Sequence, residues 1–176
     1  MRWARRFLPR QSPAPYAIIG ENTWRDYTVS ARVILPASGT GSQGAALIAR
    51  FEGFRGSAVS QFRGYELKIS GSGAWQIMAN GPAAVMLASG SVSAARAYAL
   101  SLTIRGTLIA AQINGVRVAA VTNRMYRYGP AGLGSLGYYP VRYPSFSIGS
   151  RAADPGSYRP RASARLHDTL PDAMPA

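Results

Sequence analysis

The sequence predicts an all-β protein, a two-sheet antiparallel β-sandwich or jelly roll of about ten or eleven strands. Asn114-Gly115 lies between two apolar segments, 108–113 and 116–121. Because Asn-Gly tolerates the positive φ angles of a type I′ turn, these segments are expected to form a β-hairpin. Just upstream, residues 98–105 alternate apolar with small or polar side chains, as in a half-buried strand. The three segments together predict an antiparallel meander, which is atypical of helical or nucleotide-binding enzymes.

The first half of the chain contains three further strand signals. Residues 16–19 form a short apolar segment that ends at Gly20. A longer strand ends at Pro36, and its alternate apolar residues share one face: Tyr27, Val29, Ala31, Val33 and Leu35. Residues 45–51 are almost continuously apolar, which indicates a central strand that is covered on both faces.

The second half continues in the same way. Tyr65, Leu67 and Ile69 alternate with polar residues, and a Gly-Ser-Gly turn leads into a strand over 74–79. Asn80-Gly81 ends that strand, and 83–87 is predicted to begin another. Helical turns over 83–88 and 94–97 are the alternatives. The last two predicted strands cover 131–138 and 141–148.

The length of 176 residues suits one domain, since a body of about 130 residues can bury a sufficient core without cross-links. Residues 1–15 are predicted to be a basic Pro/Arg-rich arm or linker remnant, 16–149 the domain, and 150–176 a disordered tail. The absence of cysteine excludes disulfides and thiolate metal sites. No apolar run reaches the roughly 18 residues that span a bilayer. The basic start lacks the apolar segment of a signal peptide.

The net charge of +13 is unevenly distributed. The body from 16 to 150 has twelve basic and four acidic residues, and Lys68 is the only lysine of the chain. This balance predicts attraction to anionic surfaces and salt-sensitive binding of polyanions. The arginines are scattered along the chain without a nucleic-acid-binding motif, so nucleic acid is an unfavoured partner.

Catalysis by this chain alone is not predicted. The body has four carboxylates, Glu21, Asp26, Glu52 and Glu66, each of which fits an ordinary strand-end or solvent-facing charge. Retaining glycosidases need two carboxyl groups about 5 Å apart. His167, the only histidine, lies in the predicted tail, so a Ser-His-Asp triad has no scaffold. The Gly-rich segment 39–44 lacks the spacing and lysine of a phosphate loop.

Carbohydrate binding is better supported, because sugar rings stack on aromatic side chains while polar side chains bind the hydroxyls. The aromatic candidates are Tyr138, Tyr139, Tyr126, Tyr128 and Trp75. Trp75 also suits the core, as an indole near a strand usually does. Arg50, Arg55 and Arg63 are candidates to line a sugar groove, or alternatively charges that protect a sheet edge.

The order of strands and turns resembles a known family. The opening Gly20-Glu21-Asn22-Thr23-Trp24-Arg25-Asp26-Tyr27 is similar to that of concanavalin-like, laminin-G-type jelly rolls. Gly64-Tyr65-Glu66-Leu67, Gly73-Ala74-Trp75-Gln76-Ile77, the strand 98–105 and Ile113-Asn114-Gly115 continue the likeness. In detail, residues 16–149 resemble the C-terminal lectin domain of galactocerebrosidase (galactosylceramidase), a glycoside hydrolase of sphingolipid metabolism.

The resemblance implies a jelly roll that packs, in the full enzyme, against a catalytic (β/α)₈ barrel, which this sequence lacks. It also implies a secreted or extracellular protein and a calcium site, for which the first region offers Glu21, Asn22 and Asp26. The matching position near the last strand is Pro144 or Ser145, and neither supplies a carboxylate.

The preferred hypothesis is a non-catalytic, lectin-like module that binds a glycan or glycolipid headgroup or supports a glycosidase domain encoded elsewhere. The first alternative is a C-terminal fragment of a galactosylceramidase-type hydrolase whose catalytic barrel is missing. The second alternative is a basic polyanion-binding module.

Overall fold

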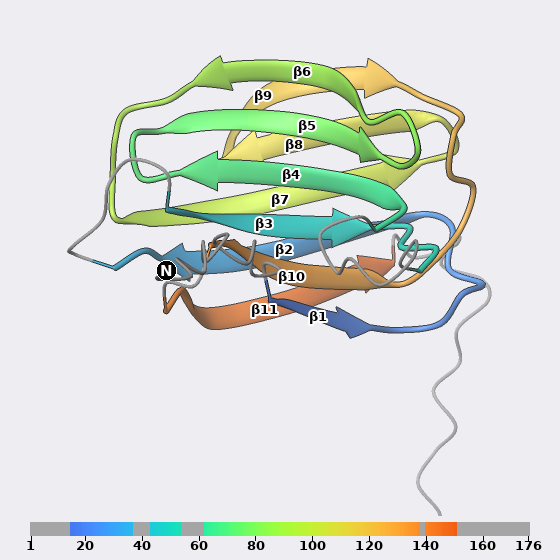
Figure 1. Cartoon of the computed structure of the whole chain (residues 1–176), viewed down its shortest axis with the longest axis horizontal. Helices are drawn as coiled ribbons and strands as arrows, with labels where there is room; N and C mark the ends of the chain where they lie inside the picture. Colours follow the sequence, from blue (N-terminus) through green and yellow to red (C-terminus); the bar gives the residue numbers. More distant parts are fainter. Residues whose placement is uncertain (1–14, 37–42, 54–61, 138–139, 151–176) are drawn as a thin grey trace, which may run out of the picture.

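The structure, a computed structural model, describes residues 15–36, 43–53, 62–137 and 140–150. These residues form eleven strands in two antiparallel sheets that lie face to face (Figure 1), which confirms the predicted sandwich. No helix that could cross a membrane is found among them. The N-terminal arm, residues 39–42 of the Gly-rich segment and the tail from 151 onward lie outside the described residues, as do Arg55, Tyr138 and Tyr139.

One sheet has six strands and the other has five. The six-stranded sheet has the order β1-β10-β3-β4-β5-β6: Tyr16–Ile19, Ala131–Leu136, Gly44–Ala49, Gly64–Ser70, Ala74–Asn80 and Val85–Ser91. The five-stranded sheet has the order β11-β2-β7-β8-β9: Arg142–Ser150, Tyr27–Ile34, Ala97–Arg105, Leu108–Ile113 and Val116–Thr122. Figure 1 shows the six-stranded sheet in front of the five-stranded sheet.

The predicted hairpin joins β8 to β9. Asn114 and Gly115 both have positive φ angles, 52° and 80°, as a type I′ turn requires. Asn114 Oδ1 also accepts a hydrogen bond of 2.9 Å from the backbone nitrogen of Ala99, so the turn is fixed against β7. The meander β7-β8-β9 is therefore formed as predicted.

The core lies between the two sheets and follows the period of two along each strand. The predicted inward face of β2 is buried, with Val29 and Val33 fully inaccessible to solvent. Strand β3 is buried along its whole length, which confirms that it is a central strand covered on both faces. Its neighbours β4 and β10 pair with it along nearly every residue.

Some boundaries differ from the prediction. Neither alternative helical turn forms: 94–96 is an irregular connection, and β6 begins only at Val85 because Pro82 and Ala83 form a turn. Strand β3 ends at Ala49 because Arg50 has a positive φ of 49°, which turns the chain out of the sheet. That turn places the Arg50 side chain at one end of the sandwich.

Candidate functional site

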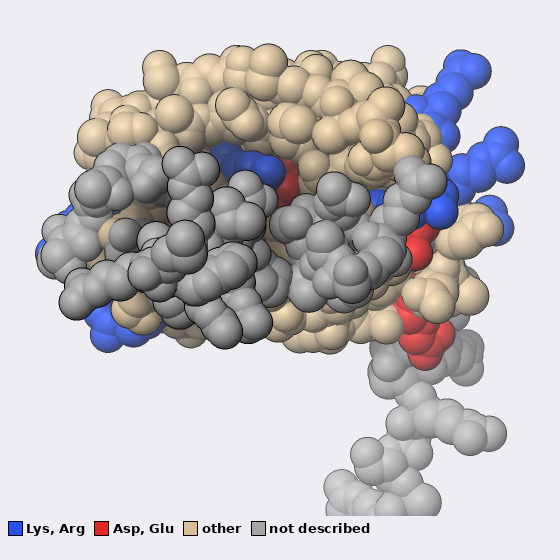
Figure 2. All heavy atoms as spheres, viewed as in Figure 1, with Lys and Arg blue, Asp and Glu red and all other residues tan. Residues whose placement is uncertain are grey.

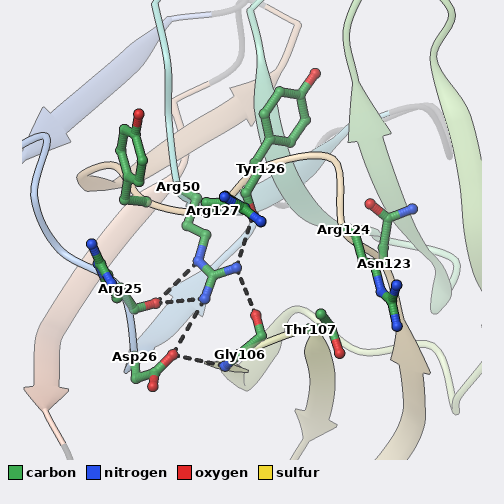
Figure 3. Close-up of a pocket in the computed structure, with 10 residues that line it drawn as sticks. Arg25, Asp26, Arg50, Gly106, Thr107, Asn123, Arg124, Tyr126 and Arg127 are labelled. Carbon is green, nitrogen blue, oxygen red and sulfur yellow. Dashed lines mark hydrogen bonds and ion pairs between the residues drawn. The ribbon is translucent and has the colours of Figure 1, made fainter.

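Four chain segments meet at one end of the sandwich and enclose a pocket of about 650 Å³. They are the segment before β2, the residue after β3, the β7–β8 turn and the segment after β9. We call this the arginine pocket and define it by its ten lining residues: Arg25, Asp26, Arg50, Gly106, Thr107, Asn123, Arg124, Tyr126, Arg127 and Tyr128 (Figure 3). The volume lies within the range typical of small-ligand sites.

Arg50 forms the base of the pocket and is only 3% exposed. Its guanidinium donates to three backbone carbonyl oxygens: Arg25 (3.0 Å from Nε and 2.8 Å from Nη2), Gly106 (2.8 Å) and Tyr126 (2.8 Å). Nη2 also donates to Asp26 Oδ1 at 3.3 Å. An arginine has five N–H donors, so all of them are used. Burial lowers the pKa of the Arg50 guanidinium, while nearby Tyr65 and Asp26 oppose that shift.

A second set of hydrogen bonds joins the same segments. The Tyr27 hydroxyl donates to the Gly129 carbonyl at 2.8 Å and accepts from the Arg50 backbone nitrogen at 2.6 Å. Burial raises the pKa of Tyr27 to about 12, so the phenol remains protonated at neutral pH. Asp26 Oδ1 accepts from the Gly106 nitrogen at 2.8 Å. The pocket thus has a base that is already fully hydrogen-bonded.

The rim of the pocket is different in character. Arg25, Arg124 and Arg127 are exposed, and Figure 3 shows them around the buried Arg50. Within the described residues, none of the three forms a salt bridge. Tyr128 lies beside them with 47% of its surface exposed. Figure 2 shows several Lys/Arg side chains projecting from the end of the sandwich where these segments lie.

Two polar side chains complete the lining. Asn123 Oδ1 accepts from the Tyr65 hydroxyl at 2.9 Å and from the Met125 nitrogen at 2.8 Å, which orients the amide. Within the described part of the chain, the Nδ2 group of Asn123 forms no hydrogen bond, so its donors can bind a ligand. The Thr107 hydroxyl lies in the same lining. Hydroxyl and amide groups of this kind bind sugar hydroxyls, so the pocket combines an aromatic ring, neutral polar groups and cations.

The structure separates the predicted sugar-binding residues. Of the candidates that the structure describes, Arg50, Tyr126 and Tyr128 line the pocket, and of these three only Tyr128 presents much surface to solvent. Tyr126 is 1% exposed, its ring packs edge-on against Tyr65 at 5.3 Å, and its hydroxyl donates to the Asn80 carbonyl. Trp75 is 6% exposed and belongs to the core, the alternative that its sequence position also allowed.

Arg63 forms a salt bridge of 3.0 Å with Glu52 and does not line the pocket. Sequence reasoning did not single out Arg25, Arg124 or Arg127. Arg25 lies just before β2, and Arg124 and Arg127 lie in the segment after β9. Because β2 pairs with β7 and the sheet is antiparallel, both segments lie at the same end as the β7–β8 turn.

Of the three residues proposed for calcium, Asp26 lies beside a positive charge. Asp26 Oδ1 already accepts hydrogen bonds from the Arg50 guanidinium and the Gly106 nitrogen. The guanidinium 3.3 Å from this oxygen disfavours a cation next to it. Glu21 and Asn22 are exposed, and the described part of the chain contains no group of three metal-ligating side chains.

The described carboxylates are also poorly arranged for glycoside hydrolysis. Asp26 is the only carboxyl group in the pocket. Glu52 pairs with Arg63, and the buried Glu66 pairs with Lys68 at 3.1 Å on β4, outside the pocket. A retaining mechanism requires two carboxyl groups on either side of one sugar bond. The pocket has the composition of a binding site.

Comparison with solved structures supports the fold. The carbohydrate-binding module CBM66 from Bacillus subtilis superposes with a TM-score of 0.58 at 14% identity, over 80% of this chain and 84% of that one. The galectin LEC-6 of Caenorhabditis elegans superposes with a TM-score of 0.54 at 14% identity, over 81% of this chain and 94% of that one. The exoplasmic/lumenal domain of VIP36, in a form with Ca²⁺ and mannose bound, superposes with a TM-score of 0.63 at 11% identity, over 81% of this chain and 76% of that one. At these identities the likeness concerns the fold alone.

Sequence comparison identifies the family. No curated protein matches the chain. The family model described as "Galactocerebrosidase, C-terminal lectin domain" matches residues 3–151, which include both sheets and every residue of the arginine pocket. The chain therefore belongs to the family of the C-terminal lectin domain of galactocerebrosidase.

Proposed function

We propose that this lectin-family domain binds carbohydrate in the arginine pocket, with Tyr128 as the surface on which a sugar ring stacks. The observation that carries the proposal is the position of the exposed Tyr128 ring on a pocket of about 650 Å³ that also offers Asn123 and Thr107. Aromatic rings bind the apolar faces of sugars, and a few polar groups fix their orientation.

The rigidity of the pocket base favours binding. Arg50 holds the carbonyl groups of three segments, and the Tyr27 hydroxyl joins the segment after β9 to the backbone of Arg50. A ligand therefore meets a pre-organised base and does not have to order it, which reduces the entropic cost of binding. Two other predicted residues, Tyr138 and Tyr139, lie outside the described residues and remain predicted contributors to sugar binding.

We propose further that the domain does not cleave glycosidic bonds by itself and acts as a glycan- or glycolipid-binding unit, alone or beside a glycosidase domain. The single carboxyl group of the pocket, Asp26, is already hydrogen-bonded through Oδ1 to Arg50 and Gly106. Calcium is not required in this proposal, because Arg50 supplies the positive charge next to Asp26.

A glycan array at about 0.15 M salt tests the proposal, because this salt concentration suppresses loose electrostatic binding. The array is run for the wild type, Tyr128→Phe and Tyr128→Ala, each with calcium and with a chelator. Phe keeps the stacking surface and Ala removes it. We expect the Phe variant to bind like the wild type, the Ala variant to lose about tenfold or more, and the chelator to have no effect.

Thermal unfolding serves as the control, since Tyr128 is half-exposed and its truncation should leave the core unchanged. Equal glycan binding by all three proteins would remove Tyr128 from the site. Absence of any glycan signal would contradict the proposed function.

A further inference from the structure

The buried arginine of the pocket and its exposed arginines differ in their ability to bind a ligand. All five donors of Arg50 are used within the protein, and its charge faces Asp26. Arg25, Arg124 and Arg127 have no salt-bridge partner in the described part of the chain. Because Arg50 and Asp26 compensate each other, the lining retains three uncompensated positive charges, all on the rim.

This charge is more than neutral sugar recognition needs. A hydroxyl group that accepts from a guanidinium does not neutralise it, so a neutral sugar leaves these positive charges uncompensated. A sulfate or carboxylate group accepts two parallel N–H donors from one arginine, and such charge-assisted bonds are roughly twice as strong as neutral ones. Three arginines around one pocket, each able to donate two parallel N–H bonds, favour an anionic group on the ligand.

The remaining lining argues that the anion belongs to a saccharide. Tyr128 offers an exposed ring, and Asn123 and Thr107 offer neutral polar groups, on the same pocket. An inorganic anion would use only the arginines. A nucleic acid would use a longer basic track, whereas these cations are gathered around one concave site of about 650 Å³.

We propose that the arginine pocket selects acidic saccharides, with Arg25, Arg124 and Arg127 binding a sulfate or carboxylate substituent while Tyr128 carries the sugar ring. This inference rests on the proposed function, of which it names the ligand class. It goes beyond the overall charge of the chain, because it places recognition in three particular side chains.

The test compares N-acetyllactosamine with its sulfated and sialylated forms by calorimetry at about 0.15 M salt. These ligands share one neutral scaffold and differ in the acidic group. The proteins are the wild type, Arg124→Gln, Arg127→Gln and the control Arg117→Gln. Arg117 is an exposed arginine at the opposite end of β9, so its substitution removes the same charge far from the pocket.

We expect at least one acidic form to bind about tenfold or more tightly than the neutral form. Arg124→Gln and Arg127→Gln should each remove most of that preference, whereas Arg117→Gln should keep it. Thermal unfolding should be the same for all four proteins, because the substituted side chains are exposed.

Each result that contradicts the inference has a different consequence. Equal affinity for neutral and acidic forms would overturn the acidic preference and leave the proposed function intact. No affinity for any saccharide would contradict both. If Arg117→Gln weakened acidic binding as much as Arg127→Gln, or if a single-stranded DNA oligonucleotide bound more tightly than the saccharides, general polyanion attraction would replace the inference.

Discussion

The guanidinium of Arg50 lies 3.3 Å from the carboxylate of Asp26, and the two side chains differ sharply in exposure, 3% against 58%. The pair therefore spans from the base of the arginine pocket to its surface. An exposed carboxylate is screened by water, so this ion pair contributes little by itself. Arg50 stabilises the site mainly through its hydrogen bonds to the backbone carbonyls of three segments.

Replacing Arg50 should therefore destabilise the protein far more than replacing Asp26. Arg50→Met leaves the carbonyl groups of Arg25, Gly106 and Tyr126 without their donors, and we expect a loss of about 2–4 kcal/mol in the free energy of unfolding. Asp26→Asn keeps an acceptor for the Gly106 nitrogen and should cost less than about 1 kcal/mol. Urea denaturation measures both, with the exposed Arg63→Met as a control. Similar losses for Arg50→Met and Arg63→Met would contradict this account.

Gly129 should tolerate no side chain, whereas Gly106 should tolerate a small one. Gly129 has a φ of +140°, and a Cβ atom there would lie 2.5 Å from the Phe51 carbonyl oxygen and 2.7 Å from the Arg50 carbonyl carbon. Gly106 has a φ of +53°, and its Cβ atom would meet no atom within 4 Å.

Gly106→Ala should therefore lower the free energy of unfolding only by the cost of holding alanine in the left-handed conformation, about 1–2 kcal/mol. Gly129→Ala should cost about 2 kcal/mol more, because backbone atoms would have to move. Denaturant melts of the two variants measure the difference. A Gly129→Ala variant as stable as Gly106→Ala would show that the segment after β9 can shift freely.

The β8–β9 turn gives a prediction that depends on conformation alone. Asn114 has a φ of 52°, and the neighbouring Gly115 has open space around it. Both Asn114→Gly and Asn114→Ala lose the hydrogen bond from the Ala99 nitrogen to the Asn114 side chain. Glycine tolerates the left-handed conformation and alanine does not, so Asn114→Ala should be less stable than Asn114→Gly by about 1–2 kcal/mol. Equal stability of the two variants, measured by thermal unfolding, would contradict the assigned role of the turn.

The strands could be predicted from the sequence because their signals are local. The alternation along β2 and the Asn-Gly turn after β8 each depend on neighbouring residues only. The arginine pocket could not be predicted in this way. Arg25 and Arg127 are about a hundred positions apart, and they share a rim because both adjoin strand ends at the same end of the sandwich.

The sequence also left the roles of Arg50 and Tyr126 open. Whether an arginine binds a ligand or the protein depends on where its donors point, and a positive φ at Arg50 turns its side chain inward. Tyr126 follows a strand, and the segment after β9 crosses to the other sheet, where the Tyr126 ring is buried against Tyr65. Both outcomes depend on contacts between segments that are distant in sequence.

Glu66 makes the protein less stable as pH rises through the acidic range. The carboxylate is fully buried on β4, Lys68 and Asn80 bind Oε2 at 3.1 and 2.7 Å, and Oε1 has no hydrogen-bond partner within the described residues. Burial raises the pKa of Glu66, against the opposing effects of Lys68 and Asn80. Between the pKa of the unfolded chain, about 4.3, and the raised pKa of the folded protein, the folded state therefore holds a proton that the unfolded state has released.

Since the folded state binds more protons in that range, the free energy of unfolding falls as pH increases, by at most about 1.4 kcal/mol per pH unit from this group. Glu66→Gln cannot titrate, so the variant should lack this part of the pH dependence. Urea denaturation of both proteins from about pH 4 to pH 7 measures the difference in slope. The wild type should lose more stability than the variant on going to pH 7, and parallel curves would show that Glu66 ionises in the folded protein as readily as in the unfolded chain.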